Sequence, residues 1–158
     1  MSATRKIVLV AGAVSPDRTI ALERLLRREA DNTGWSDRLE IRLGGIGAGA
    51  GHVSDAGEAA LRAHGIDAAG AACPDLERRR DLFDGATMIV TDSGQAADTL
   101  VDWDETADAD FVSLDELGGG GGEDAETAPG QAPIAQDVDE IARLVTEVLR
   151  RVVATPAL

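Results

Sequence analysis

The feature of this sequence that most constrains its fold is the alternation of short apolar runs with segments of helical periodicity. Strands are predicted at four such runs, residues Lys6–Val10, Leu39–Leu43, Ala86–Thr91 and Phe111–Leu114. Helices are predicted between and after them, over residues 18–31, 54–65, 74–82, 93–100 and 136–153. Strands that alternate with helices predict an α/β fold, here a three-layer sandwich with a four-stranded parallel sheet flanked by helices.

The chain has the length of one domain, and we expect residues 1–158 to form a single one. One stretch interrupts the alternation of strands and helices. Five glycines begin at Gly118, and acidic residues, Pro129 and Gly130 follow them without a large apolar residue as an anchor. We therefore expect a mobile loop at residues 118–131.

The net charge of −14 comes from 29 acidic and 15 basic residues. Such an acidic surface repels phosphate groups, so we expect neither nucleic acid nor an anionic membrane as a partner. Solubility alone explains the charge equally well. The N-terminal segment lacks a signal-peptide core and no apolar run reaches the roughly 20 residues of a membrane span, so we expect a cytoplasmic protein.

Cys73 is the one cysteine, which excludes an intrachain disulfide and a cysteine cluster for zinc. We expect its thiol to be structural, and we predict no metal and no cofactor. The sequence does not name a partner: a protein and a small-molecule ligand both stay open, for a monomer or weak homodimer.

The first strand, its loop and the following helix carry the most specific pattern. Residues 8–12 (VLVAG) lead into residues 13–19 (AVSPDRT) and then into residues 20–27 (IALERLLR). This stretch resembles the opening of the low-molecular-weight protein tyrosine phosphatases, a strand, a C-x5-R-[ST]-P loop and a helix reading roughly M-A-E-A-L-L-R. Residues 44–46 (GGI), 63–67 (AHGID) and 84–92 resemble further family segments in the family's order. The resemblance covers about residues 5–152 and implies the family's fold.

The resemblance implies that the loop Gly12, Ala13, Val14, Ser15, Pro16, Asp17, Arg18 and Thr19 is the ligand-binding segment. In the family a cysteine thiolate attacks phosphorus, while loop N–H groups and the arginine cradle the phosphoryl oxygens. Gly12 stands six residues before Arg18, where that cysteine belongs, and glycine carries no nucleophile. We therefore expect no protein tyrosine phosphatase activity by the family mechanism.

Three further residues of this loop disfavour phosphate. Pro16 lacks an N–H donor, and Val14 replaces a family glycine where a tight turn is needed. Asp17 places a carboxylate beside Arg18, and we expect the two to pair and to repel a dianion.

Other groups are candidates for chemistry without the cysteine. Glu126 lies about where the family has the Asp-Pro pair of its general acid, although an acidic solvated loop explains it as well. Ser15 is the hydroxyl inside the loop, and His52 follows a glycine-rich turn that borders the family's active site. Arg18 is the strongest candidate because doubly wound folds bind ligands at strand-to-helix turns; its alternative role is to order the loop.

These observations leave two hypotheses. In the first, the protein is a catalytically degenerate phosphatase-like protein, a pseudophosphatase, which acts as a binding or regulatory module. In the second, it is an enzyme of the same fold repurposed for cysteine-independent chemistry, for example in a biosynthetic pathway. The candidate working groups of that enzyme are Arg18, Asp17, Ser15, His52 and Glu126.

Overall fold

The structure is a computed structural model that describes residues 5–117 and 134–154. Its main sheet has four parallel strands in the order β2-β1-β5-β6, formed by Leu39–Gly45, Lys6–Gly12, Ala86–Thr91 and Asp110–Ser113. A small antiparallel pair, β3 (Gly51–His52) with β4 (Ala72–Cys73), lies beside it. The predicted α/β fold with a four-stranded parallel sheet is confirmed. The expected mobile loop at residues 118–131 lies outside the described residues.

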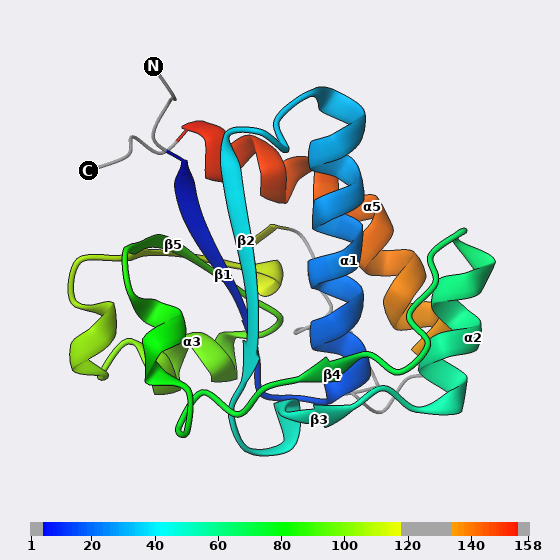
Figure 1. Cartoon of the computed structure of the whole chain (residues 1–158), viewed down its shortest axis with the longest axis horizontal. Coiled ribbons are helices and arrows are strands. Elements are labelled where there is room, and N and C mark those ends of the chain that lie inside the picture. The colour runs from blue at the N-terminus through cyan, green and yellow to red at the C-terminus, as the bar shows by residue number, and fades with distance from the viewer. Residues whose placement is uncertain (1–4, 118–133, 155–158) are drawn as a thin grey trace.

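Helices cover both faces of the sheet, so the fold has three layers (Figure 1). On one face lie α1 (Pro16–Thr33) and α5 (Ile134–Ala154), with α2 (Asp55–Ala63) beside them. On the other face lie α3 (Gly94–Leu100) and the 3-10 turns η2 (Arg80–Phe83) and η3 (Asp104–Thr106). Two further 3-10 turns, η1 (Gly47–Gly49) and η4 (Leu114–Leu117), follow β2 and β6.

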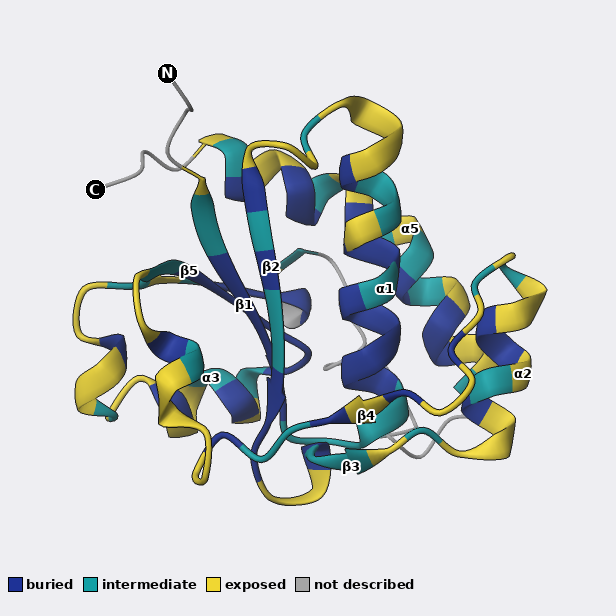
Figure 2. Ribbon diagram, viewed as in Figure 1, coloured by how far each residue is buried: buried dark blue, intermediate teal, exposed yellow. Residues whose placement is uncertain are grey.

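Each face of the sheet has its own apolar core because successive strand residues point to opposite sides. Val8 and Val10 of β1 pack toward α1 and α5, whereas Leu9 and Ala11 pack toward α3. Most residues of β1 and β5 and the inward face of α1 are accordingly buried, whereas β2 has both buried and intermediate residues (Figure 2). Because these cores fix the register of β1, they also fix where the loop after Gly12 begins.

The ends of most elements follow local sequence signals. Ser15 is the N-cap of α1, with Pro16 in the first turn, so the helix begins two residues earlier than the sequence pattern predicted. Gly34 ends the same helix with a φ of 82°, a left-handed conformation that suits glycine. Ser54 and Ser93 cap α2 and α3 as predicted.

The helix predicted over residues 74–82 is wrong. The side chain of Asp75 accepts a hydrogen bond from the backbone N–H of Glu77 at 3.0 Å, and the Asp75 carbonyl accepts from Arg78 and Arg79. These local bonds form a turn that competes with a helix, and only residues 80–83 form a 3-10 segment.

Candidate functional site

The β1–α1 loop lies at the point where the strand order of the sheet reverses. The strand that follows β1 along the chain pairs on one side of it, and β5 pairs on the other. In open α/β sheets, ligands bind at the carboxyl ends of the strands that meet at such a point. Here those ends are Gly12 of β1 and Thr91 of β5, so Ala13 and Asp92 are the first residues beyond the sheet.

Asp92 holds this loop with its side chain. Its Oδ1 accepts a hydrogen bond from the backbone N–H of Ala13 at 3.2 Å, and the backbone N–H of Val14 also stabilises the charged form of this carboxylate. The hydroxyl of Ser93 donates to the same oxygen at 3.2 Å. Because Asp92 is fully buried, its carboxylate is a fixed internal acceptor at the start of the loop.

Arg18 reaches back from the first turns of α1 to the same place. Its Nη2 donates to the backbone carbonyl of Asp92 at 3.1 Å, and its Nε lies 3.9 Å from Asp92 Oδ2. Its Nη1 lies 3.3 Å from Oδ1 of Asp137, in the first turn of α5. Arg18 is only 4% exposed, so a ligand from solvent has little access to the guanidinium.

Burial changes the protonation chemistry of both carboxylates. Loss of solvent raises the pKa of Asp92, and Arg18 and the hydrogen bonds from Ala13, Ser93 and Val14 oppose this only in part. Burial also raises the pKa of Asp137, with a further increase from nearby Glu140 and an opposing effect of Arg18. The site thus contains two carboxylates that compete for one guanidinium.

Position 12 has no room for a side chain. A Cβ placed on Gly12 would lie 2.9 Å from Cβ of Thr19 and closer still to its hydroxyl oxygen. That hydroxyl donates to the Ser15 carbonyl at 2.9 Å, which keeps the threonine turned toward Gly12. Thr19 is fully buried and fills the volume beside the end of β1.

Asp17 does not pair with Arg18, and this expectation is wrong. Its carboxylate accepts hydrogen bonds from the backbone N–H of Ser54, at 2.7 Å, and from the Ser54 hydroxyl. The start of α2 offers Asp17 two donors, whereas the Arg18 side chain is drawn inward to Asp92 and Asp137.

Ser15 has a structural task, since its Oγ accepts from the backbone N–H of Arg18 at 3.2 Å as the cap of α1.

The glycine-rich turn after β2 packs directly on the loop. The N–H of Ile46 donates to the Gly12 carbonyl at 2.9 Å, and a Cβ on Gly49 would clash with the Gly12 backbone. His52 lies in β3 and is exposed, and no hydrogen bond or ion pair within the described residues joins it to the loop. β3 lies beside the start of α1, where a Cβ on Gly51 would be 3.2 Å from Pro16 Cγ, but no such bond within the described residues links His52 to Ser15 or Arg18.

Cys73 is not suited to replace the missing nucleophile, because its thiol is buried and protonated. Burial, with smaller contributions from Asp92 and Glu23, raises the pKa of its thiol to about 12. A thiol with such a pKa stays protonated at neutral pH. Glu126, the candidate general acid, lies outside the described residues.

Solved structures of phosphatases share this architecture. The chain is similar to a mutant of YwlE from Bacillus subtilis, with a TM-score of 0.72 and 17% identity over 94% of this chain and 98% of that one. It is similar to a low-molecular-weight protein tyrosine phosphatase from T. tengcongensis, with a TM-score of 0.72 and 19% identity over 92% and 99%. It is also similar to the YwlE arginine phosphatase from Geobacillus stearothermophilus, with a TM-score of 0.65 and 20% identity over 96% and 94%.

The chain has the low-molecular-weight phosphatase fold. Neither the family models nor the curated protein sequences contain a match to it. The β1–α1 loop with Arg18 is the segment that the sequence resemblance implies as the ligand-binding loop. The partners of Arg18, however, are carboxylates of the chain itself.

Sequence reasoning missed Asp92 and Asp137 as members of the site, although each carries a signal. Asp92 ends the segment of residues 84–92 that resembles the family's Asp-rich strand. Asp137 lies four residues before Ile141, on the buried stripe that continues with Val145 and Val148. An acidic residue on an apolar helical stripe signals a buried partner.

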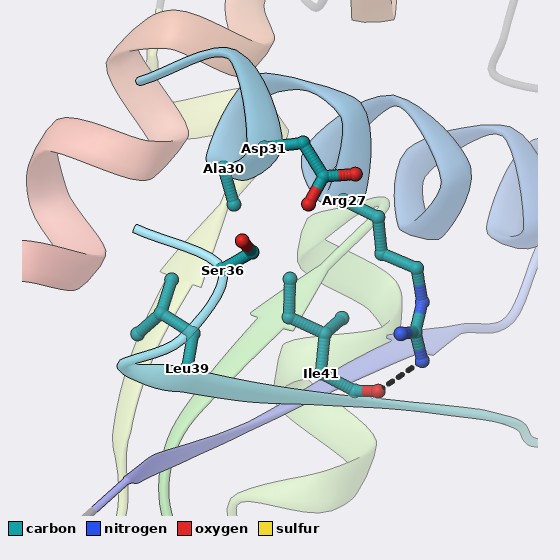
Figure 3. A pocket seen from close by; sticks show the side chains of 6 residues that line it. All are labelled: Arg27, Ala30, Asp31, Ser36, Leu39 and Ile41. Carbon is teal, nitrogen blue, oxygen red and sulfur yellow. Dashed lines mark hydrogen bonds between the residues drawn. The ribbon is translucent and has the colours of Figure 1, made fainter. Parts of the chain in front are cut away.

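This chain also has a small pocket at the C-terminal end of α1, far from the β1–α1 loop. Arg27, Ala30, Asp31, Ser36, Leu39 and Ile41 line it (Figure 3). Its volume is about 100 Å³, and Arg27 is bound to Glu23 and to the Ile41 carbonyl.

In the described part of the chain, no group of three or more acidic, histidine or cysteine side chains could hold a metal ion. No described helix combines the length and hydropathy of a membrane span.

Proposed function

We propose that the protein is a pseudophosphatase, a non-hydrolytic protein of the low-molecular-weight phosphatase fold that acts in the cytoplasm as a binding or regulatory module. Its partner is a protein or a small-molecule ligand. The observation that carries this proposal is the closure of the β1–α1 loop by the buried carboxylate of Asp92.

Closure by Asp92 occupies part of the donor set that a phosphoryl group needs. The N–H of Ala13 is bonded to Asp92, and the N–H of Arg18 is bonded to the Ser15 side chain. Pro16 has no N–H to offer. A phosphate dianion at this loop would also lie close to the Asp92 carboxylate, and like charges in a site of low dielectric repel strongly.

The nucleophile is missing for a separate reason. Gly12 has no side chain, and Thr19 fills the space in which one would lie. Cys73, with a pKa of about 12, is protonated at neutral pH and does not replace it. These observations support a protein that keeps the phosphatase fold and uses it for binding.

Hydrolysis assays test the proposal. The purified protein is incubated with an aryl phosphate and, because some structural neighbours carry the name arginine phosphatase, with a phosphoarginine peptide. We expect phosphate release at the rate of the buffer blank, equal to that of Cys73→Ser. Turnover by the wild type above the buffer blank would show that the protein handles phosphate, and the proposal would be wrong.

A further inference from the structure

The Arg18 cluster, defined as Arg18, Asp92 and Asp137, contains one positive charge and two negative charges. Its members come from three elements: α1, the segment after β5, and the first turn of α5. Asp92 is 0% exposed and Asp137 is 7% exposed. The cluster therefore carries one carboxylate more than its guanidinium can neutralise.

Nearby charges do not remove this excess. Glu140, one turn along α5, raises the pKa of Asp137 and so adds negative potential. Glu23 on α1 pairs with Arg24 at 3.1 Å and with Arg27, and Asp17 binds Ser54. Asp92 also raises the pKa of the nearby Cys73 thiol, which is protonated at neutral pH and so adds no charge to the cluster.

Geometry also leaves part of the cluster unsatisfied. Arg18 Nε and Asp92 Oδ2 are buried, face each other at 3.9 Å and make no hydrogen bond within the described residues. Burial disfavours the charged form of both carboxyls, and the single guanidinium opposes this only in part, so the cluster binds a proton more tightly than a carboxyl does in water. Asp137 belongs to this site only while the first turn of α5 is docked.

We propose that the Arg18 cluster is a proton-dependent latch, which holds one proton while the first turn of α5 is docked on the closed loop. Undocking returns Asp137 to water, where its carboxyl has its ordinary affinity for a proton. A group whose pKa is raised in the docked state stabilises docking at low pH, and this contribution is lost as the pH rises through the docked pKa. The latch therefore loosens as the pH rises and frees one of the two partners of Arg18.

This inference deepens the proposed function, because it assigns a regulatory input to the loop that we propose as the binding face. Its test uses no phosphate and no partner. Phosphate turnover by the wild type would overturn the proposed function and leave the latch standing. Docking of α5 that does not depend on pH would overturn the latch and leave the proposed function standing.

Amide hydrogen exchange at several pH values between about 4 and 8 tests the latch, with protection factors corrected for the intrinsic exchange rate. For the first turns of α5 in the wild type, we expect the opening equilibrium to rise by up to about tenfold per pH unit between the undocked pKa, roughly 3.9, and the docked pKa, and to level off above the docked pKa. The C-terminal turns of α5 serve as an internal reference. In Asp137→Asn this pH dependence should disappear, whereas in Asp98→Asn, a change at an exposed carboxyl on α3, it should remain.

Protection factors that do not change with pH in the wild type, or a dependence that persists in Asp137→Asn, would overturn the latch. A carboxyl ¹³C NMR titration of the wild type keeps the test decisive even where Asp137→Asn fails to fold. At least one of Asp92 and Asp137 should titrate above the ordinary range of aspartate, roughly pH 3.9. Titration of both within or below that range would contradict the proposal.

Discussion

Individual side chains close the β1–α1 loop: Asp92 binds its backbone, and Arg18 links it to the rest of the fold. It joins the loop to Asp92 and to α5 through contacts that are almost entirely buried. An arginine in this position has a structural task, because each of its partners would otherwise be a buried, uncompensated charge.

Replacement of Arg18 by alanine should lower the free energy of unfolding by about 3–5 kcal/mol, because it leaves two carboxylates without their cation. The measurement is urea denaturation followed by circular dichroism at neutral pH. Arg78→Ala, at an exposed arginine in the 74–79 turn, is the matched control and should change stability by about 0.5 kcal/mol or less. Equal effects of the two changes would contradict the assigned role of Arg18.

Gly12 and Thr19 should be energetically coupled. Gly12→Cys alone forces a side chain against Thr19 and should cost about 1–3 kcal/mol through overpacking. Thr19→Ala removes the atoms that clash, so the double variant should be more stable than the sum of the single changes predicts. A double-mutant cycle in urea measures this coupling. Additive effects would show that Thr19 does not fill the space at position 12.

The Cys73 thiol should be unreactive in the folded protein. Its pKa of about 12 keeps the thiolate fraction very small at pH 8, and the side chain is only 3% exposed. We expect slow, unfolding-limited reaction with a disulfide reagent in buffer and rapid reaction in guanidinium chloride. Rapid labelling of the folded protein would contradict the structural role of this cysteine.

Among the elements, α1 and α2 are joined where both helices begin. The Asp17 carboxylate accepts from Ser54, while the Ser54 hydroxyl oxygen accepts from the N–H of Gly57 at 3.0 Å. A Cβ on Gly57 would lie 2.6 Å from Asp17 Cγ, so glycine permits this close approach. The contact fixes the start of α2 against the loop.

Ser54→Ala should reduce the free energy of unfolding by about 0.5–2 kcal/mol, because the change removes the cap of α2 and one donor to Asp17. Thermal and urea unfolding measure it. Ser36→Ala, at an exposed serine outside any helix, is the control and should have an effect of about 0.5 kcal/mol or less. If the two variants had the same stability, the contact between Asp17 and Ser54 would not stabilise the start of α2.

Most elements could be predicted from the sequence because their signals are local. The run of residues 86–91 predicts β5 with the bounds that the structure has, and serine caps mark α2 and α3. The helix predicted over residues 74–82 failed because the Asp75 turn satisfies the same backbone groups locally. The pairing of Arg18 could not be predicted from its neighbours in sequence, because its partners are brought in by β5 and α5.

For the whole molecule, fold and function depend on different residues. Structures with 14–20% identity share the architecture, whereas function depends on the residues of the site. Function depends on whether the loop at the end of β1 is open to a ligand. Here Asp92 binds the loop backbone, Asp137 pairs with Arg18, and Thr19 fills the space beside Gly12. For these reasons we propose binding in place of hydrolysis.

The Asp92 carboxylate binds the start of the β1–α1 loop, and we propose that this loop therefore does not bind an oxyanion. Titration of the ¹⁵N-labelled wild type with inorganic phosphate, followed by the amide signals of Ala13 and Val14, tests it most directly. The account predicts that these two signals shift no more than those of exposed surface amides up to tens of millimolar phosphate. A saturable shift confined to the loop would contradict it, because the donors would then be open to an oxyanion.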